Sequence, residues 1–250
     1  MAAIAAVPSL AVAETPASKF DCVAPPDLAR LDYPLRRAGQ RLAAGLPLTI
    51  VAVGSSSTSG AGASSPAMSY PSRLAVELKT LFPRSEISVI NRGVGGETAK
   101  EMLARFDSEV IADKPDMVVW QVGSNSVLRD QPLDPAGALI RQGLRTLKAA
   151  GADVILMNPQ YAPKVIAKHD AELMVDLIGR AAKEAHVDLF QRFAVMRYWR
   201  LTEGIPFETF VSPDELHMND WSYGCVAKLL AGAIAEAAQR PTQTAGASAR

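Results

Sequence analysis

The chain has 250 residues, of which 48% are hydrophobic and 21% are charged. This composition is that of a globular protein and excludes intrinsic disorder, which needs low hydrophobicity and a high net charge. The 26 Lys and Arg residues balance the 26 Asp and Glu residues. A general nucleic-acid binder is therefore not expected, because neutralisation of phosphates dominates that affinity. No apolar run approaches the roughly 20 residues that cross a bilayer, so no transmembrane segment is predicted.

The N-terminus has features of a secretory signal. Residues 2–13 are small and apolar and end in Ala11-Val12-Ala13, which resembles the apolar core and cleavage site of a signal peptide. This pattern predicts a signal peptide over residues 1–13 and export to the periplasm or the medium. The alternative is an apolar tail on a cytoplasmic protein, since the usual cationic segment is missing. At the other end, the polar residues 241–250 are expected to form a disordered tail.

The two cysteines, Cys22 and Cys225, are too far apart in sequence for a CxxC metal or redox motif. In an exported protein they could pair in one disulfide that closes a very long loop. In a cytosolic protein they would instead be two free, buried thiols. The choice between these alternatives depends on export.

The predicted elements begin with a strand at residues 48–53, where a β-branched apolar run lies between Pro47 and Gly54. A helix then starts at Pro71, a residue suited to a first helical turn, and stops before Pro83. The remaining predicted elements are strands at 87–90, 117–122, 154–157 and 187–190, and helices at 135–150, at 170–185 and through Cys225 to Ile234.

This alternation of strands and helices predicts a parallel sheet with helices on both faces. The expected fold class is α/β, a three-layer α/β/α sandwich with a flavodoxin-like, five-stranded parallel sheet. No linker or internal repeat divides the chain, so one domain over residues 25–240 is predicted. In such sheets ligands bind beyond the carboxyl ends of the strands, which directs attention to the loops that follow them.

The loop after the first strand reads Gly-Ser-Ser-Ser-Thr-Ser-Gly over residues 54–60. It lacks the lysine of a phosphate-binding P-loop, and Thr58 stands where the GxSxG elbow of α/β-hydrolases needs a glycine. A dinucleotide-binding GxGxxG motif is also absent, although a nucleotide binder that uses Gly60, Gly95 and Gly96 is retained as an alternative. The loop remains compatible with a serine nucleophile at a strand-to-helix turn.

Two further loops carry groups that could stabilise negative charge. Residues 91–98, after the second strand, contain three glycines, which let another group approach backbone N–H atoms closely. Asn125 follows the third strand, and its side-chain amide could donate a hydrogen bond to an oxyanion. Each loop could equally be a plain turn.

The sequence has three histidines, His169, His186 and His217. His169 lies between charged residues and is expected to be solvated, and His186 follows a helix and is expected to be structural. Asp214 stands three residues before His217, close enough to orient the imidazole of a general base. The alternative is that Asp214 caps the last helix. No His, Cys or carboxylate cluster has metal-ligand spacing, so no metal is predicted.

Taken together, residues 48–60, 91–98, 120–126 and 214–219 resemble, in this order, the four sequence blocks of the SGNH (GDSL-type) hydrolase family. The Asp-x-x-His block is the most specific of the four, and the Gly-x-Asn block is the next. The resemblance extends over most of the chain, from the first strand to the last helix.

The resemblance implies a role for five residues. Ser56 falls at the nucleophile, His217 at the general base and Asp214 at the acid that orients it. The backbone N–H groups of Ser56 and Gly96, with the amide of Asn125, fall at the oxyanion hole.

Two departures from the family pattern are visible. Ser55 stands at the usual Asp of the Gly-Asp-Ser block, which leaves three consecutive serines and keeps Ser55 and Ser57 as alternative nucleophiles. Ser124 and Ser126 flank Asn125, where Gly-Asn-Asp is more usual.

The resemblance further implies a serine ester hydrolase that works through an acyl-serine without a cofactor. Short-chain acyl or acetyl esters are the expected substrates, small molecules or glycans, with Tyr161 after the fourth strand as a residue that could line the cleft. A thioesterase or lysophospholipase-type acyl hydrolase, and a non-catalytic carbohydrate-binding module of the same fold, are the alternatives. Oligomeric state is not predicted.

Overall fold

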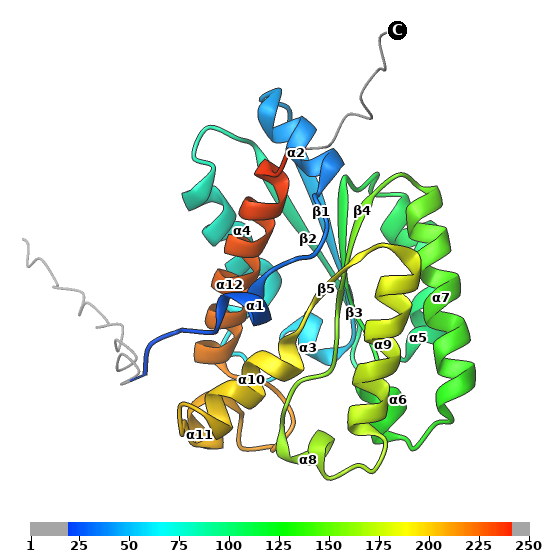
Figure 1. The fold of residues 1–250 in the computed structure, drawn as a ribbon, viewed down its shortest axis with the longest axis vertical. Coiled ribbons are helices and arrows are strands. Elements are labelled where there is room, and N and C mark those ends of the chain that lie inside the picture. The colour runs from blue at the N-terminus through cyan, green and yellow to red at the C-terminus, as the bar shows by residue number, and fades with distance from the viewer. Residues whose placement is uncertain (1–19, 242–250) are drawn as a thin grey trace, which may run out of the picture.

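The computed structural model describes residues 20–241. The signal peptide predicted at 1–13 and all but the first residue of the tail predicted at 241–250 lie outside the described residues. A five-stranded parallel sheet with strand order β2-β1-β3-β4-β5 forms the centre of the fold (Figure 1). Its strands are β1 (Leu48–Gly54), β2 (Ile87–Gly93), β3 (Met117–Gln121), β4 (Asp153–Met157) and β5 (Asp188–Phe190). The predicted flavodoxin-like sheet is confirmed.

The central strands are continuous apolar runs because both faces of the sheet are covered. Successive side chains of a strand point to opposite faces. Accordingly, Ile50 packs into one hydrophobic core and Val51 into the other. Likewise, Val119 and Trp120 of β3 divide between the two cores. A strand buried on both faces therefore needs no polar alternation, which is the pattern that identified β1 in the sequence.

Helices cover the two faces as separate layers (Figure 1). One face carries α2 (Arg36–Ala43), α4 (Tyr70–Leu81) and α12 (Asp220–Gln239), and the other carries α5 (Ala99–Ala104), α7 (Leu133–Ala149) and α9 (Ala171–Ala185). The predicted three-layer sandwich is thus confirmed. No helix within residues 20–241 combines the length and apolar character needed to cross a membrane.

The remaining helices are short and lie mostly in the connections. They are α1 (Pro26–Ala29), α3 (Ser56–Ser59), the 3₁₀ turn at Pro66–Met68, the π-helical segment at Phe106–Ile111, α6 (Ser124–Leu128), α8 (Pro163–Ile166), α10 (Arg192–Leu201) and α11 (Phe207–Phe210). The sequence analysis did not predict α10, because the helix begins with a charged residue, Arg192, at a fully buried position.

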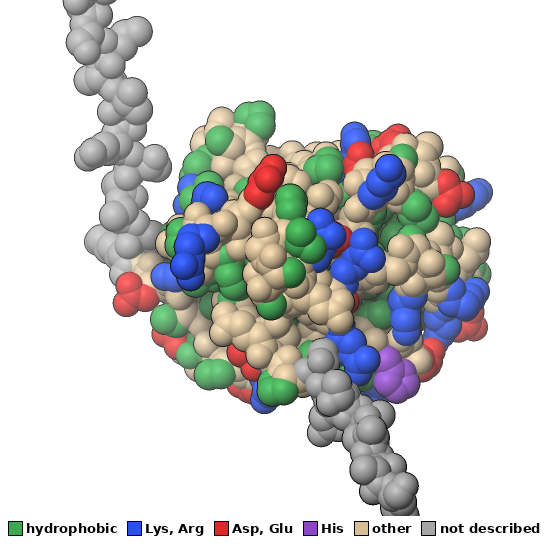
Figure 2. Space-filling model, turned by 90° about the horizontal axis from the view of Figure 1, so that it is seen from above, with side chains coloured by type: hydrophobic (Ala, Val, Ile, Leu, Met, Phe, Trp, Pro, Cys, Tyr) green, Lys and Arg blue, Asp and Glu red, His purple; other side chains and the backbone are tan. Residues whose placement is uncertain are grey.

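Three aspartates at the amino ends of strands hold residues 33–41 against the sheet. Asp116 and Asp188 are buried, and Asp153 is partly buried. Asp116 pairs with Arg37 at 2.8 Å and with Arg41 at 2.9 Å. Asp188 accepts a hydrogen bond from Tyr33 N at 2.8 Å, and burial raises the pKa of its carboxyl to about 6. Figure 2 looks down on this end of the molecule, where basic and acidic side chains are interspersed. These contacts give the amino edge of the sheet a structural role.

A disulfide joins the first described segment to the last helix. Cys22 and Cys225 are bonded with an S–S distance of 1.99 Å and lie 203 residues apart in sequence. Trp199 Nε1 also donates to Val23 O at 2.8 Å, so the segment is held by a side chain as well. The alternative of two free thiols is therefore wrong.

Reduction of this disulfide should lower the melting temperature. A bond that closes a loop this long contributes about 2–5 kcal/mol by restricting the unfolded chain. In a domain of this size each kcal/mol corresponds to about 2–4 °C, so a drop of roughly 4–20 °C is expected. Calorimetry with and without reductant measures it, and a Cys22→Ser/Cys225→Ser double variant should not respond to reductant. An unchanged melting temperature in a wild-type sample with two titratable thiols would contradict this role.

Candidate active site

The loops named by the sequence analysis meet at the carboxyl edge of the sheet, where α3, α6 and α8 lie (Figure 1). Parallel strands direct all their carboxyl ends to one edge, so loops far apart in sequence converge there. The site is assembled from the turn after β1, the loops after β2 and β3, and the loop before α12.

Ser56 occupies the first position of α3, directly behind β1. The chain reaches it through Gly54, where a Cβ atom would lie 2.2 Å from Thr58 Oγ1 and 2.8 Å from Gln121 Oε1. Only a glycine allows the first turn of the helix to fold back this closely over the end of the strand. The sharp turn leaves the Ser56 side chain at the edge of the sheet.

The three consecutive serines have different surroundings. Ser55 is buried, and both its backbone N and its Oγ donate to Gln121 Oε1, at 2.9 Å and 3.0 Å. Ser57 is 1% exposed. Ser56 is partly exposed, and its Oγ lies 2.8 Å from His217 Nε2. The structure thus places Ser56, rather than Ser55 or Ser57, against the imidazole.

Asp214 and His217 form the second hydrogen bond of the series that begins at Ser56. His217 Nδ1 lies 2.5 Å from Asp214 Oδ2, while Asp214 Oδ1 accepts hydrogen bonds from the backbone N–H groups of Leu216 and His217. Burial alone would raise the pKa of the Asp214 carboxyl, but the His217 side chain and these two N–H groups outweigh it and leave the pKa below its ordinary value. Asp214 is therefore ionised near neutral pH and can stabilise a cationic imidazole. The cap of α12 is Asn219, so the alternative role of Asp214 is wrong.

The loop that carries this pair is closed on itself and packed against the turn after α3. Val211 and Met218 pair as an antiparallel bridge, and Ser212 N donates to His217 O at 2.8 Å. Gly62 abuts the loop with a φ of +88°, and a Cβ there would lie 2.9 Å from His217 Cβ. The backbone of His217 is therefore held by Ser212, and Gly62 packs closely against its Cβ.

The turn of Ser56 and the two neighbouring loops carry three N–H groups that are available as donors. In the part of the chain that the structure describes, the backbone N–H groups of Ser56 and Gly96 donate to no protein acceptor. Gly95 brings this loop beside the serine, since a Cβ at Gly95 would lie 4.0 Å from Ser56 Cβ. The amide of Asn125 donates one hydrogen bond to Glu97 O at 2.8 Å and has a second N–H. The arrangement supplies the donors that an oxyanion hole requires.

Two arginines that the sequence analysis missed hold the glycine loop in place. Arg129 Nη2 donates to Gly96 O at 2.6 Å, which fixes a residue whose φ is +80°. Arg105 pairs with Glu97 at 2.7 Å and donates to Arg92 O at 2.8 Å. Arg129 stands four residues after Asn125, so both reach the same loop from one face of α6.

Tyr161, His169 and His186 form no hydrogen bond with Ser56, His217 or Asp214 in the described part of the chain. Tyr161 is part of an aromatic cluster, with its ring 5.1 Å from that of Phe193 and 6.0 Å from that of Phe207. His169 is exposed beside Asp170, and His186 ends α9 with a φ of +51°. Within residues 20–241, no group of three or more His, Cys, Asp or Glu is placed to hold a metal ion.

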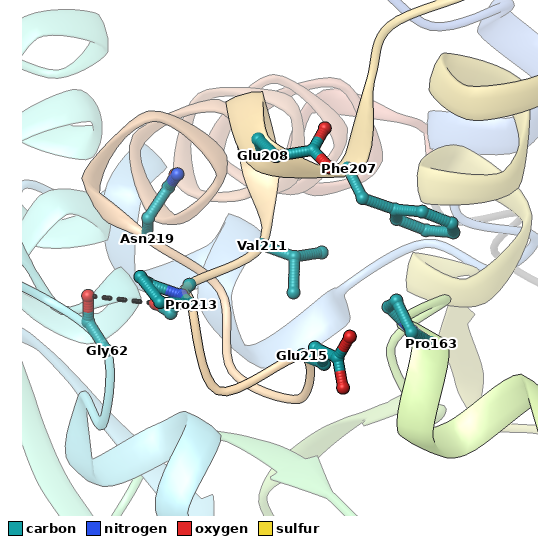
Figure 3. Close-up of a pocket in the computed structure, with 9 residues that line it drawn as sticks. Gly62, Pro163, Phe207, Glu208, Val211, Pro213, Glu215 and Asn219 are labelled. Atoms are coloured by element: carbon teal, nitrogen blue, oxygen red, sulfur yellow. Dashed lines mark hydrogen bonds between the residues drawn. The ribbon is translucent and has the colours of Figure 1, made fainter.

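A hollow of about 510 Å³ lies beside the loop that carries Asp214 and His217. Figure 3 shows Pro163, Phe207, Val211 and Glu215 arranged around it. Glu208 also lines it, so the hollow combines two carboxylates with apolar surface. Such a surface can accept hydrogen bonds from hydroxyl groups and disfavours anions.

A Ser-His-Asp series at the carboxyl edge of a five-stranded parallel sheet, with available N–H donors in the adjoining loops, is the arrangement of the SGNH-type hydrolases. The chain belongs to the non-GDSL lipase-like family, whose model matches residues 21–240. This family name agrees with Ser55 standing where the GDSL pattern has aspartate.

Similar proteins include an acetylxylan esterase from Geobacillus stearothermophilus, which is 32% identical over an alignment of 120 residues that covers 43% of this chain and 53% of the relative. Thioesterase 1/protease 1/lysophospholipase L1 of Escherichia coli K12 is 29% identical over 126 residues, 49% of this chain and 60% of the relative. The alignments thus span less than two thirds of these relatives.

Solved structures share the fold. A two-domain esterase active on acetylated mannans superposes with a TM-score of 0.73 and 22% identity, over 85% of this chain and 56% of the other. An acetyl xylan esterase from Geobacillus stearothermophilus gives a TM-score of 0.66 and 21% identity, over 76% of this chain and 96% of the other.

A serine-directed phosphonate p-nitrophenyl ester should label Ser56 alone. The imidazole activates only the hydroxyl that it contacts, and an unactivated serine is a poor nucleophile. Peptide mass spectrometry locates the adduct, and Ser55→Ala serves as the matched control that should still be labelled. An adduct on Ser55 or Ser57 would contradict the geometry.

Proposed function

We propose that the protein is a serine ester hydrolase that removes acetyl or other short acyl groups from carbohydrate or small-molecule esters. The observation that carries the proposal is the hydrogen-bonded series Ser56–His217–Asp214, with distances of 2.8 Å and 2.5 Å. Esterase-named relatives support the same reaction class.

The reaction proceeds in two halves. His217 Nε2 takes the proton of Ser56 as Oγ attacks the ester carbonyl carbon, and the carbonyl oxygen becomes an oxyanion. The tetrahedral species collapses, the alcohol leaves with the proton from His217, and an acyl-serine remains. Water then repeats the sequence, which releases the acid and restores Ser56. Asp214 holds the imidazole in the required tautomer and stabilises its cationic form.

The oxyanion is bound by the N–H groups of Ser56 and Gly96 and by the second N–H of Asn125. These donors are held before substrate arrives, because Arg129 fixes Gly96 and Glu97 O holds the Asn125 amide. Such donors stabilise charge that develops only in the transition state and therefore raise kcat.

The hollow beside the triad supports an alcohol portion rich in hydroxyl groups. Its lining includes the acidic residues Glu208 and Glu215. Names of relatives agree with this, since one is an acetylxylan esterase and one solved neighbour is active on acetylated mannans. An acetylated glycan is accordingly the substrate class that we propose.

A second candidate is hydrolysis of longer acyl esters or thioesters. It is favoured by the relative named thioesterase 1/protease 1/lysophospholipase L1 and uses the same acyl-serine chemistry. Acyl chains from acetyl to octanoyl separate the two candidates, since the first predicts a maximum at acetyl.

Export is part of the proposal. The Cys22–Cys225 disulfide supports it, because disulfides persist mainly in oxidising compartments. Protein recovered from the periplasm or medium should have a mass that lacks residues 1–13. Recovery only from the cytoplasm, with Met1 intact, would contradict export.

Hydrolysis of p-nitrophenyl acetate should be lost in Ser56→Ala and strongly reduced in Asn125→Ala. Removal of one oxyanion donor costs about 2.7–4 kcal/mol, so Asn125→Ala should lower kcat by roughly 100- to 1000-fold. Steady-state kinetics on folded variants measures both effects. A non-catalytic binding module would instead show no wild-type activity, and Asn125→Ala with a normal kcat would exclude that residue from the oxyanion hole.

A further inference from the structure

A buried side chain behind the triad contacts both catalytic loops. Gln160 lies in the segment after β4 and is 2% exposed. Its Oε1 accepts hydrogen bonds from Ser124 Oγ at 2.9 Å and from Arg192 Nη2 at 3.0 Å, and its Nε2 donates to Leu216 O at 3.1 Å. Every polar atom of this amide therefore has a partner.

The orientation of the amide follows from its neighbours. The oxygen and nitrogen of a Gln amide are distinguished by their hydrogen-bond partners. The guanidinium of Arg192 can only donate, so it selects Oε1, and Nε2 must then face a carbonyl oxygen. Leu216 O is that acceptor. The Arg192 cation thus determines which end of Gln160 meets the histidine loop.

Arg192 is itself a buried cation with an unusual environment. It is fully buried, and within residues 20–241 no salt bridge joins it to a carboxylate. Burial lowers the pKa of its guanidinium to about 10, which leaves the group charged near neutral pH. Its Nε donates to Asn158 O at 3.0 Å, so the same arginine also holds the start of the segment that carries Gln160.

The two loops that Gln160 joins carry different parts of the catalytic apparatus. Ser124 precedes Asn125, whose amide belongs to the oxyanion donors. Leu216 precedes His217, and its N–H donates to Asp214. One side chain therefore connects the residue next to an oxyanion donor with the residue next to the general base.

We infer that Gln160 is a positioning residue that sets the spacing between His217 and Asn125, and that Arg192 sets the orientation of its amide. This inference rests on the proposed function of the same site. Small displacements matter here, because a misplacement of about 1 Å can cost roughly 100-fold in rate.

The test is the near-isosteric variant Gln160→Glu. Its carboxylate still accepts from Ser124 and Arg192, but it places an oxygen in place of a donor against Leu216 O. We expect kcat for p-nitrophenyl acetate to fall roughly 10- to 100-fold, with KM within about twofold and a folded circular dichroism spectrum. Gln160→Met removes both hydrogen-bonding ends of the side chain and should likewise lower kcat with little change in KM. This second variant tests the inference if Gln160→Glu does not fold. Gln40→Glu on exposed α2 is the control for the added charge.

Phosphonylation of Ser56 separates this inference from the proposed function. Its rate depends on His217 and on the oxyanion donors but not on the natural substrate, so it can be measured even in a protein that hydrolyses no tested ester. A rate that falls 10- to 100-fold in folded Gln160→Glu supports the positioning role. Wild-type phosphonylation in a folded Gln160→Glu variant, or a change confined to KM, would overturn it. A wild-type protein that is phosphonylated at Ser56 but hydrolyses none of the tested esters would count against the proposed function and not against the positioning role.

Discussion

The hydrogen bond between Ser56 Oγ and His217 Nε2 joins residues 161 positions apart, and the carboxyl edge of the fold is organised to keep them 2.8 Å apart. The serine end is held by β1, which pairs with both β2 and β3. The histidine end is held by a loop that the Val211–Met218 bridge closes. Because β1 lies between β2 and β3, it cannot shift without breaking two hydrogen-bonded ladders. The conformational freedom that remains at the site is therefore in the loops that follow the strands.

Buried polar side chains hold these loops in place, and their burial costs free energy. Gln121 at the end of β3 receives Ser55 N, Ser55 Oγ and Thr58 Oγ1, and Gln160 after β4 receives or donates three further hydrogen bonds. Burying an amide is unfavourable unless it is hydrogen-bonded. Both ends of the Gln160 amide have partners, whereas Gln121 is bonded through Oε1 and its buried Nε2 has no partner among the described residues. The amides behind the triad therefore stabilise particular loop conformations rather than the fold in general.

The secondary structure was largely predictable because the strands are apolar runs bounded by Gly and Pro. All five predicted strands are present, and α12 includes the helix predicted from Cys225 to Ile234. The α10 helix was missed, since Arg192 occupies a core position that a hydrophobic pattern assigns to an apolar residue. The role of Tyr161 in lining the cleft stays a prediction, and its ring contacts Phe193 and Phe207.

The sequence by itself determined the order of strands and helices along the chain, because hydrophobic periodicity is a local property, and its four family-like blocks predicted Gly96, Asn125, Asp214 and His217 as site residues. It left open which of Ser55, Ser56 and Ser57 meets the imidazole, and whether the two cysteines pair. Only the tertiary structure decided these points, together with the roles of Arg129, Gln160 and Arg192 around the loops. Each depends on hydrogen bonds or a covalent bond between segments that are remote in sequence, and such contacts leave no periodic or composition signal along the chain.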